Sequence, residues 1–278
     1  MLQKMVFGPR SRLSPDLDFT SRTPIDRDGL PVMMLDALAE PYNGIVFRFD
    51  KDKDWYLTSD GCAANPVCSH AGNEKGVKIK LQVSTHELPI LGVEAMPQVQ
   101  QDYFKLLPYH PASISCLAFE EVIAEKIRAA SQRSKIRDLL DLSEVSARPL
   151  QRDLIRALAV LKLWNSGGRG LDFKRLRRRI QDDSSYDIAD LRNLLRKDQN
   201  PVLNDMIVRV VEGFHFLADL TERREPWRWT RCNAVARKRA NFSSRWVKDA
   251  VVSERADTVR DCSLWGHDCR QQRKDFEG

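Results

Sequence analysis

The sequence has no long apolar run. None of its hydrophobic stretches approaches the roughly 20 residues that a helix needs to span a bilayer, and the N-terminus lacks a secretory apolar segment. These two absences exclude a membrane-spanning protein and a secreted protein as interpretations. We therefore expect a soluble, cytoplasmic protein, whose 278 residues suffice for one large domain or two small ones.

The six cysteines include no Cys-x-x-Cys pair of the kind that typifies zinc sites. Cys62, Cys68 and His70 lie close together in what we expect to be a loop, where two thiolates and an imidazole could in principle bind zinc. No fourth ligand is apparent. Reduced cytosolic thiols are the default interpretation of these cysteines.

The body of the chain lacks a charge excess, although the whole sequence carries a net charge of +6 and has a pI of about 9.0. Residues 226–278 hold 12 Lys and Arg against 7 Asp and Glu, which leaves 33 against 32 for residues 1–225. The run from Lys174 to Arg179 is therefore better support for contact with a phosphate backbone than the overall pI is. A solvated helix face explains this run at least as well.

Two aspartates one residue apart are the most informative feature that is present. Asp16 and Asp18 occur in an alternating apolar stretch that ends at Phe19. Because side chains alternate between the two faces of a β-strand, both carboxylates should share one face, and Leu17 and Phe19 should point into the core. Paired carboxylates suit Mg²⁺, which takes hard oxygen ligands. A polar strand edge is the structural alternative.

Hydrophobic periodicity divides the chain into three parts. Residues 1–110 combine short apolar alternations with Pro and Gly, which indicates a mixed sheet, together with one helix from Asp26 to Glu40. Residues 111–225 place apolar side chains three and four apart. The helices expected there are Ser115–Gln132, Asp138–Glu144, Leu150–Trp164, Asp172–Asp182, Ile188–Leu195 and Asn204–Leu220. Residues 226–278 follow no sustained period, and we expect a disordered or non-native tail.

Two further segments accompany the aspartate pair. One is the strand-like stretch Val77–Ser84, and the other runs from Glu120 to Leu142 and contains Lys126. In this order, with Arg12-x-Ser14-x-Asp16-x-Asp18, they closely resemble the AbiEii/MenT family of nucleotidyltransferase toxins, from residue 2 to about residue 225. These toxins belong to type IV toxin–antitoxin systems.

The resemblance implies an α+β fold of the DNA polymerase beta superfamily, with a mixed sheet and a C-terminal helical bundle. Residues 1–110 would form the nucleotidyltransferase-like catalytic domain, and residues 111–225 the helical domain. Two departures matter. The family's Gly-Gly-Thr or Gly-Ser signature would stand just before Leu2 and is absent here, which should weaken phosphate binding. Gln82 stands where the family has an acidic residue, and an amide cannot replace a carboxylate as a base or a cation ligand.

The resemblance also implies roles for individual residues. Asp16 and Asp18 are the expected Mg²⁺ ligands, and Ser14 would shape the phosphate pocket. Lys126 matches the lysine of the third motif and would meet the triphosphate as a point charge, unless it is only a helix-surface residue. Asp138 matches the family's functional Arg-Asp. This assignment requires the aspartate pair and Lys126 to border one site.

Three neighbouring positions receive weaker assignments. Asp141 shares a helix face with Asp138, and we expect it to cap the helix or to pair with Arg137. Lys80 could contact phosphates. Lys78 should lie on the same strand face as Lys80, so spacing alone does not separate the two lysines.

The activity that the resemblance implies is transfer of a nucleotide from a nucleoside triphosphate to RNA, commonly the 3′ end of tRNA, which blocks aminoacylation and arrests growth. A cognate antitoxin is the implied protein partner, and no membrane is involved. Two alternatives remain open. The missing glycines and Gln82 would suit a catalytically impaired protein that binds RNA or an antitoxin without transfer, and nucleotide transfer to a protein side chain is the third possibility.

Overall fold

The largest sheet has four strands in the order β1-β7-β4-β3. β1 and β7 run parallel, and the other neighbouring pairs are antiparallel, so the sheet is mixed and β1 lies at its edge. A three-stranded sheet has the order β2-β5-β6, and β8 pairs with β9. The strands are β1 Asp16–Thr20, β2 Val46–Arg48, β3 Trp55–Thr58, β4 Gly61–Ala64, β5 Val67–His70, β6 Asn73–Lys78, β7 Lys80–Ser84, β8 Val93–Met96 and β9 Ile114–Leu117.

This computed structural model describes residues 1–219, apart from residues 9–10, 15, 27, 43, 51, 86, 102–110 and 168–169. The tail expected over residues 226–278 lies outside the described residues. None of the helices in the described part of the chain combines the length and the apolar character needed to cross a bilayer.

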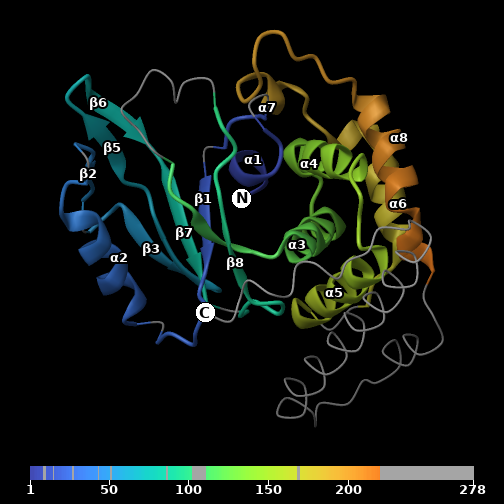
Figure 1. Cartoon of the computed structure of the whole chain (residues 1–278), viewed down its shortest axis with the longest axis horizontal. Coiled ribbons are helices and arrows are strands. Elements are labelled where there is room, and N and C mark those ends of the chain that lie inside the picture. The colour runs from blue at the N-terminus through green and yellow to red at the C-terminus, as the bar shows by residue number, and fades with distance from the viewer. Residues whose placement is uncertain are drawn as a thin grey trace, which may run out of the picture.

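One face of the four-stranded sheet is covered by α2 (Leu30–Ala39). Leu30, Met34 and Leu38 recur every four residues and pack against Cys62 and Ala64 of β4. Figure 1 shows α2 on the side of the sheet that faces away from the other helices. A helix here was predicted from Asp26 to Glu40. It begins four residues later, with Pro31 in its first turn, where the missing N–H of proline is tolerated.

The prediction that Leu17 and Phe19 point into the core is wrong. Their side chains are 46% and 50% exposed. They lie opposite Leu81 and Val83 in the β1–β7 register, on the face that α2 covers. Because β1 is an edge strand and α2 packs over β4, the apolar side of β1 is only half covered.

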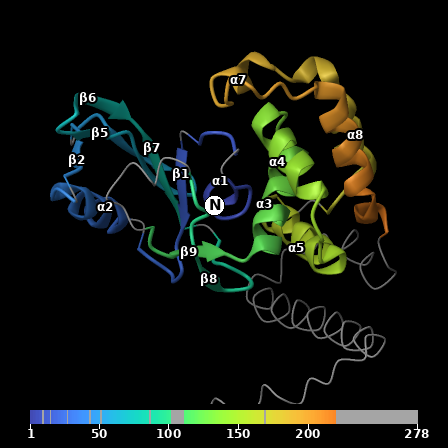
Figure 2. The same ribbon diagram turned by 45° about the horizontal axis from the view of Figure 1, so that its top comes forward.

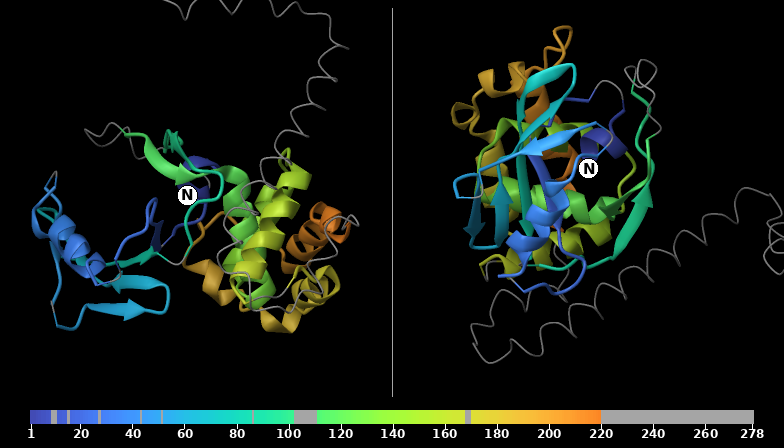
Figure 3. Two further views of the ribbon diagram at one scale, coloured as in Figure 1. Left: turned by 90° about the horizontal axis from the view of Figure 1, so that it is seen from below. Right: turned by 90° about the vertical axis from the view of Figure 1, so that its left-hand side faces the viewer.

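The remaining helices pack together on the other side of the four-stranded sheet (Figures 1 and 2). Seen from below, α2 and the two larger sheets lie toward one end of the molecule, and the helices from α3 to α8 lie toward the other (Figure 3, left). The helices, with two short 3₁₀ helices, are α1 Leu2–Met5, α3 Phe119–Gln132, α4 Ile136–Ser146, α5 Arg152–Asn165, α6 Phe173–Gln181, η2 Asp183–Ser185, α7 Ala189–Arg192, α8 Leu203–Gly213 and η3 His215–Ala218. We call this group the helical half.

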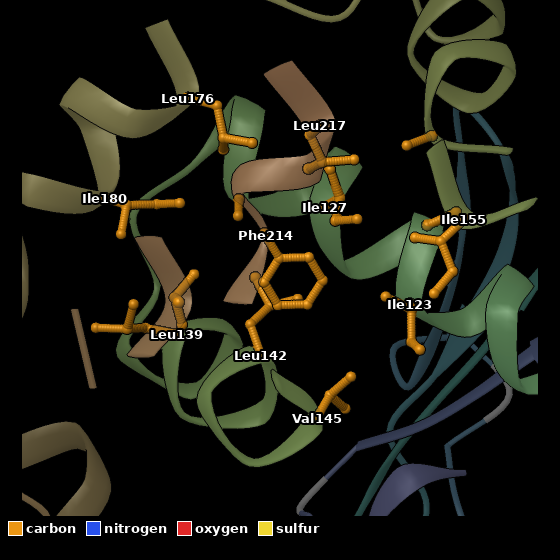
Figure 4. Packing of buried hydrophobic residues seen from close by; sticks show 14 of the residues in the cluster. Ile123, Ile127, Leu139, Leu142, Val145, Ile155, Leu176, Ile180, Phe214 and Leu217 are labelled. Atoms are coloured by element: carbon orange, nitrogen blue, oxygen red, sulfur yellow. The ribbon is translucent and has the colours of Figure 1, made fainter. Parts of the chain in front are cut away.

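The core of the helical half forms around Phe214, which is 2% exposed. Figure 4 shows Leu139 and Leu142 of α4, together with Leu176 and Ile180 of α6, arranged around this ring. The predicted helices recur here with end shifts of a few residues. Leu2 of α1 also belongs to this core, so the N-terminal helix is anchored to the helical half.

Two predictions about local structure are wrong. The stretch from Val77 to Ser84 is not one strand, because the chain leaves the β5–β6 sheet after Lys78 and enters the four-stranded sheet at Lys80. The N–H of Ile79, between the two strands, donates to the carbonyl of Pro66. Residues 114–117 form β9, so the helix expected from Ser115 begins only at Phe119.

The cysteines of the expected zinc loop lie on strands. Cys62 is fully buried in β4, and Cys68 and His70 belong to β5 of the other sheet. Burial raises the pKa of the Cys62 thiol, which opposes the deprotonation that a metal ligand needs. The prediction of a loop here is wrong.

The close contact between α4 and α8 depends on Gly213. A Cβ atom added at this position would lie 2.5 Å from Cβ of Ser146, the last residue of α4. We expect Gly213→Ala to lower the free energy of unfolding by about 1–3 kcal/mol, because the two backbones must move apart. Urea denaturation measures this loss. The double variant G213A/S146G removes the clash and should recover most of the loss, whereas an unrecovered loss would contradict the explanation.

Candidate active site

A cavity of about 550 Å³ lies between helices α3 and α4 and the face of the four-stranded sheet that is opposite α2. Asp16 and Asp18 of β1 line one wall, together with Gln82 of β7, and Lys126 of α3 and Asp138 of α4 line the opposite wall. The volume lies in the range of small-molecule sites. The structure therefore brings together, around one cavity, segments that are more than 100 residues apart in the sequence.

The two aspartates of β1 differ in their contacts. Asp16 Oδ2 lies 3.3 Å from Nη1 of Arg137 on α4, so this ion pair crosses the cavity from sheet to helix. No hydrogen bond or ion pair engages the carboxylate of Asp18 among the described residues. Asp18 lies opposite Gln82 in the β1–β7 register. Asp18 therefore offers both carboxylate oxygens to a ligand, and Asp16 offers one without disturbing Arg137.

Lys126 is held by two carboxylates. Its Nζ lies 2.8 Å from Asp138 Oδ1 and 2.9 Å from Asp141 Oδ2. Burial lowers the pKa of Lys126, but the charges of Asp141 and Asp138 outweigh this effect and raise it. Burial likewise raises the pKa of Asp138, and the neighbouring Lys126 and Arg133 outweigh it and lower the pKa. Lys126 and Asp138 therefore stay charged at neutral pH.

Asp141 connects three segments of the chain, and the prediction that it pairs with Arg137 is wrong. Its carboxylate accepts from Nε and Nη2 of Arg12 at 2.9 and 2.7 Å, which is a bidentate contact. The amide of Gln3 on α1 also donates to it, at 2.8 Å. Only 2% of the Asp141 side chain is exposed. Its contacts with Gln3 and Arg12 join residues more than 120 positions apart, which helical spacing does not reveal.

A second ion cluster closes one end of the cavity. Nζ of Lys162 on α5 lies 2.9 Å from Glu121 Oε1 and 2.8 Å from Glu125 Oε1, and Glu87 lies 3.3 Å away. Burial lowers the pKa of Lys162, but Glu125 and Glu121 outweigh it and raise the pKa. Glu121 also accepts from the backbone N–H groups of Ile90 and Leu91. This cluster fixes the segment after β7 against α3.

Three positively charged side chains lie near the N-terminus of α4. Arg133, Lys135 and Arg137 all border the cavity there. Lys135 is exposed and, within the described ranges, has no ion pair. The N-terminus of a helix carries partial positive charge and free N–H groups, so this end of α4 favours an anion. Lys135 and Arg137 were not among the residues predicted to bind phosphates, although the Lys-x-Arg spacing at a helix start is a usable signal.

The other predicted site residues are placed as follows. Ser14 borders the cavity, and its hydroxyl donates to the carbonyl of Asp16 at 3.2 Å. Lys80 lies opposite Asp16 in the register but does not line the cavity. Lys78 belongs to a different sheet and lies 3.8 Å from Asp54, so the prediction that it shares a strand face with Lys80 is wrong.

The donor set fits a magnesium ion that is completed by substrate. Mg²⁺ is usually bound by one or two carboxylates, with water and substrate phosphates as the other ligands. Asp16 and Asp18 supply such a pair. Among the described residues, no group of three or more His, Cys, Asp and Glu side chains could form a complete protein cage. The pair alone is consistent with a cation that arrives with its nucleotide.

The fold is similar to that of a nucleotidyltransferase toxin of known structure. MenT4, a nucleotidyltransferase toxin from Mycobacterium tuberculosis H37Rv, superposes with a TM-score of 0.72 at 20% sequence identity, over 88% of this chain and 82% of that one. JHP933 from Helicobacter pylori matches at 18% identity over 78% of this chain and 81% of that one, with a TM-score of 0.43. A search of curated proteins gave no match.

One protein-family model matches most of the chain. The model described as nucleotidyl transferase AbiEii toxin, type IV TA system, matches residues 1–231. This range includes the whole cavity and every residue described above. The chain therefore belongs to the AbiEii family of nucleotidyltransferase toxins of type IV toxin–antitoxin systems.

Proposed function

We propose that this toxin is a Mg²⁺-dependent enzyme that transfers a nucleotide from a nucleoside triphosphate to an RNA acceptor, namely the 3′ end of tRNA. Transfer to this end blocks aminoacylation and thereby translation, and a cognate antitoxin restrains the activity. The observation that carries the proposal is the cavity itself, in which two carboxylates on the sheet face a group of cations on the helical half.

Asp16 and Asp18 are the residues that would hold the metal ion. A bound Mg²⁺ neutralises phosphate charge and favours the deprotonated form of an attacking hydroxyl. The two carboxylates share the cavity face of β1, and the hydroxyl of Ser14 donates to the carbonyl of Asp16 itself, which fixes the backbone there. With Gln82 in place of the family's acidic residue, β7 adds no third carboxylate beside the aspartate pair, although Asp60, after β3, also borders the cavity.

The triphosphate would lie between this pair and the start of α4. Lys135 is free for its phosphates, and Arg137 reaches across the cavity to Asp16. In the reaction, the acceptor hydroxyl attacks the α-phosphorus, the bond to the bridging oxygen breaks, and pyrophosphate leaves. Cations preorganised around the leaving group stabilise the charge that develops on it, and such electrostatic stabilisation is usually the largest single contribution to catalysis.

Lys126 would act as a fixed positive charge and not as a proton donor. Its ammonium group lies within 3 Å of both Asp138 and Asp141, and its raised pKa keeps it protonated. A side chain held by two carboxylates loses no further rotamer freedom when substrate binds. Asp138 and Asp141 therefore position Lys126, and Arg133 completes the neutralisation of Asp138.

Labelled nucleotides test the proposal directly. The protein is incubated with each of the four labelled nucleoside triphosphates, Mg²⁺ and total RNA. We expect label in the tRNA fraction with at least one nucleotide and none in the presence of EDTA. Label on protein instead of RNA would identify a side-chain acceptor.

A melting experiment separates binding from transfer. A ligand present at 100 times its dissociation constant stabilises the folded state by about 2.7 kcal/mol. A melting shift with triphosphate and Mg²⁺, but no label on any acceptor, would reject the transferase proposal and favour a binding protein.

A further inference from the structure

The basic run from Lys174 to Arg179 forms α6, and this helix has one buried face. Leu176 and Ile180 are 3% and 4% exposed and point into the core of the helical half, as Figure 4 shows. Lys174 and Arg178 lie one helical turn apart on the opposite face, and both are exposed. The run is therefore a surface, and we call Lys174, Arg175 and Arg178 the α6 basic face.

The charges of the α6 basic face are not neutralised by acids in the part of the chain that the structure describes. No ion pair involves Lys174, Arg175 or Arg178 there. The two aspartates at the helix ends have other partners: Asp172 accepts from the N–H of Arg175 as the N-cap, and Asp182 accepts from Ser184. Like charges three and four residues apart on a helix repel each other. A polyanion would relieve this repulsion.

The α6 basic face lies next to residues that line the cavity. Arg179 lies one turn from Arg175 on the same flank of α6, and its Nη1 is 3.5 Å from the carbonyl of Gln132 at the end of α3. Gln132, with the adjacent Arg133, borders the cavity. Positive charge therefore extends from the outer surface of α6 to residues that line the cavity.

We propose that the α6 basic face binds the phosphodiester backbone of the RNA acceptor and guides its end into the cavity. This inference rests on the proposed function for the identity of the polyanion. A single nucleotide does not explain a convex surface outside the cavity, whereas a polymer reaches both. An anionic membrane is disfavoured, because the apolar face of α6 is already buried in the protein core.

Binding by phosphate contacts has a measurable salt dependence. The affinity for single-stranded nucleic acid falls with salt, and each phosphate contact contributes about 0.7 to the slope of log K against log salt. We expect K174A/R178A to lower this slope by about 1.4 for a polyuridine oligonucleotide and for bulk tRNA, measured by fluorescence anisotropy without nucleoside triphosphate. Because both side chains are exposed, the variant should fold normally, and its melting shift with triphosphate should be unchanged.

The matched control removes the same charge from the other half of the molecule. Lys53 and Lys75 are exposed and lie in the sheet half, so K53A/K75A should leave the slope unchanged. Three outcomes would each overturn the proposal. The salt slope could be unchanged in K174A/R178A, or it could fall equally in both variants. Polyglutamate could also compete for the surface as effectively as RNA does. Failure of nucleotide transfer with normal RNA binding would reject the proposed function but leave the docking surface in place.

Discussion

The double variant D16N/D18N is expected to lose nucleotide transfer by more than about 100-fold, because β1 would then present no carboxylate to the cavity that can hold a cation. Its fold should persist, since Asp18 makes no hydrogen bond or ion pair with the other described residues and Asp16 makes a single partly exposed ion pair. The free energy of unfolding should change by less than about 1 kcal/mol. Initial rates of label transfer at saturating RNA measure the effect on activity.

A matched control is D36N, at an exposed position on the outer face of α2. It removes the same kind of charge far from the cavity and should leave transfer unchanged. If D16N/D18N keeps full activity while its circular dichroism and melting match those of the parent protein, then the site is misassigned. A parallel loss in D36N would indicate a general effect of net charge.

Replacing Asp141 by Asn is expected to lower the free energy of unfolding by about 3 kcal/mol or more, because it leaves Arg12 buried without a charge partner. The side chain of Arg12 is only 7% exposed. Lys126 loses one of its two carboxylates in the same variant, so transfer should fall together with stability. Urea denaturation monitored by circular dichroism gives the stability, and the labelling assay gives the activity.

A solvent-exposed ion pair serves as the control for D141N. Lys53 lies 3.5 Å from Asp50 and is 81% exposed, so K53Q should change the free energy of unfolding by less than about 1 kcal/mol. The variant R12M/D141L tests the explanation further, since apolar residues of similar size can replace a buried pair with little loss of stability. A loss for the double variant as large as for D141N alone would contradict an unpaired charge as the cause.

Features that depend on neighbouring positions in the chain could be predicted from the sequence. The alternation around Asp16 and Asp18 predicted a strand with both carboxylates on one face, and both border the cavity. Apolar spacing predicted most of the helices of the helical half. The order of three motifs indicated the family, which the match to residues 1–231 confirms.

Features that depend on distant partners could not be obtained this way. The pairing of Asp141 with Arg12 joins residues that no local rule connects, and local spacing pointed to Arg137 instead. The half-exposed state of Leu17 and Phe19 follows from the position of β1 at a sheet edge, which alternation does not encode. Likewise, sequence spacing places Lys78 and Lys80 on one strand face, but the chain changes sheets between them.

The anchoring of the first residues to the helical half has a mechanical consequence. The N–H of Leu13 donates to the carbonyl of Leu194, and the strand that carries the aspartates begins only three residues later. At the other end of the same sheet, Ser84 ends β7, and Ile90 is already fixed to Glu121. The sheet wall of the cavity is thus held to the helical half at both ends of the β1–β7 strand pair, which limits how far the two walls can separate.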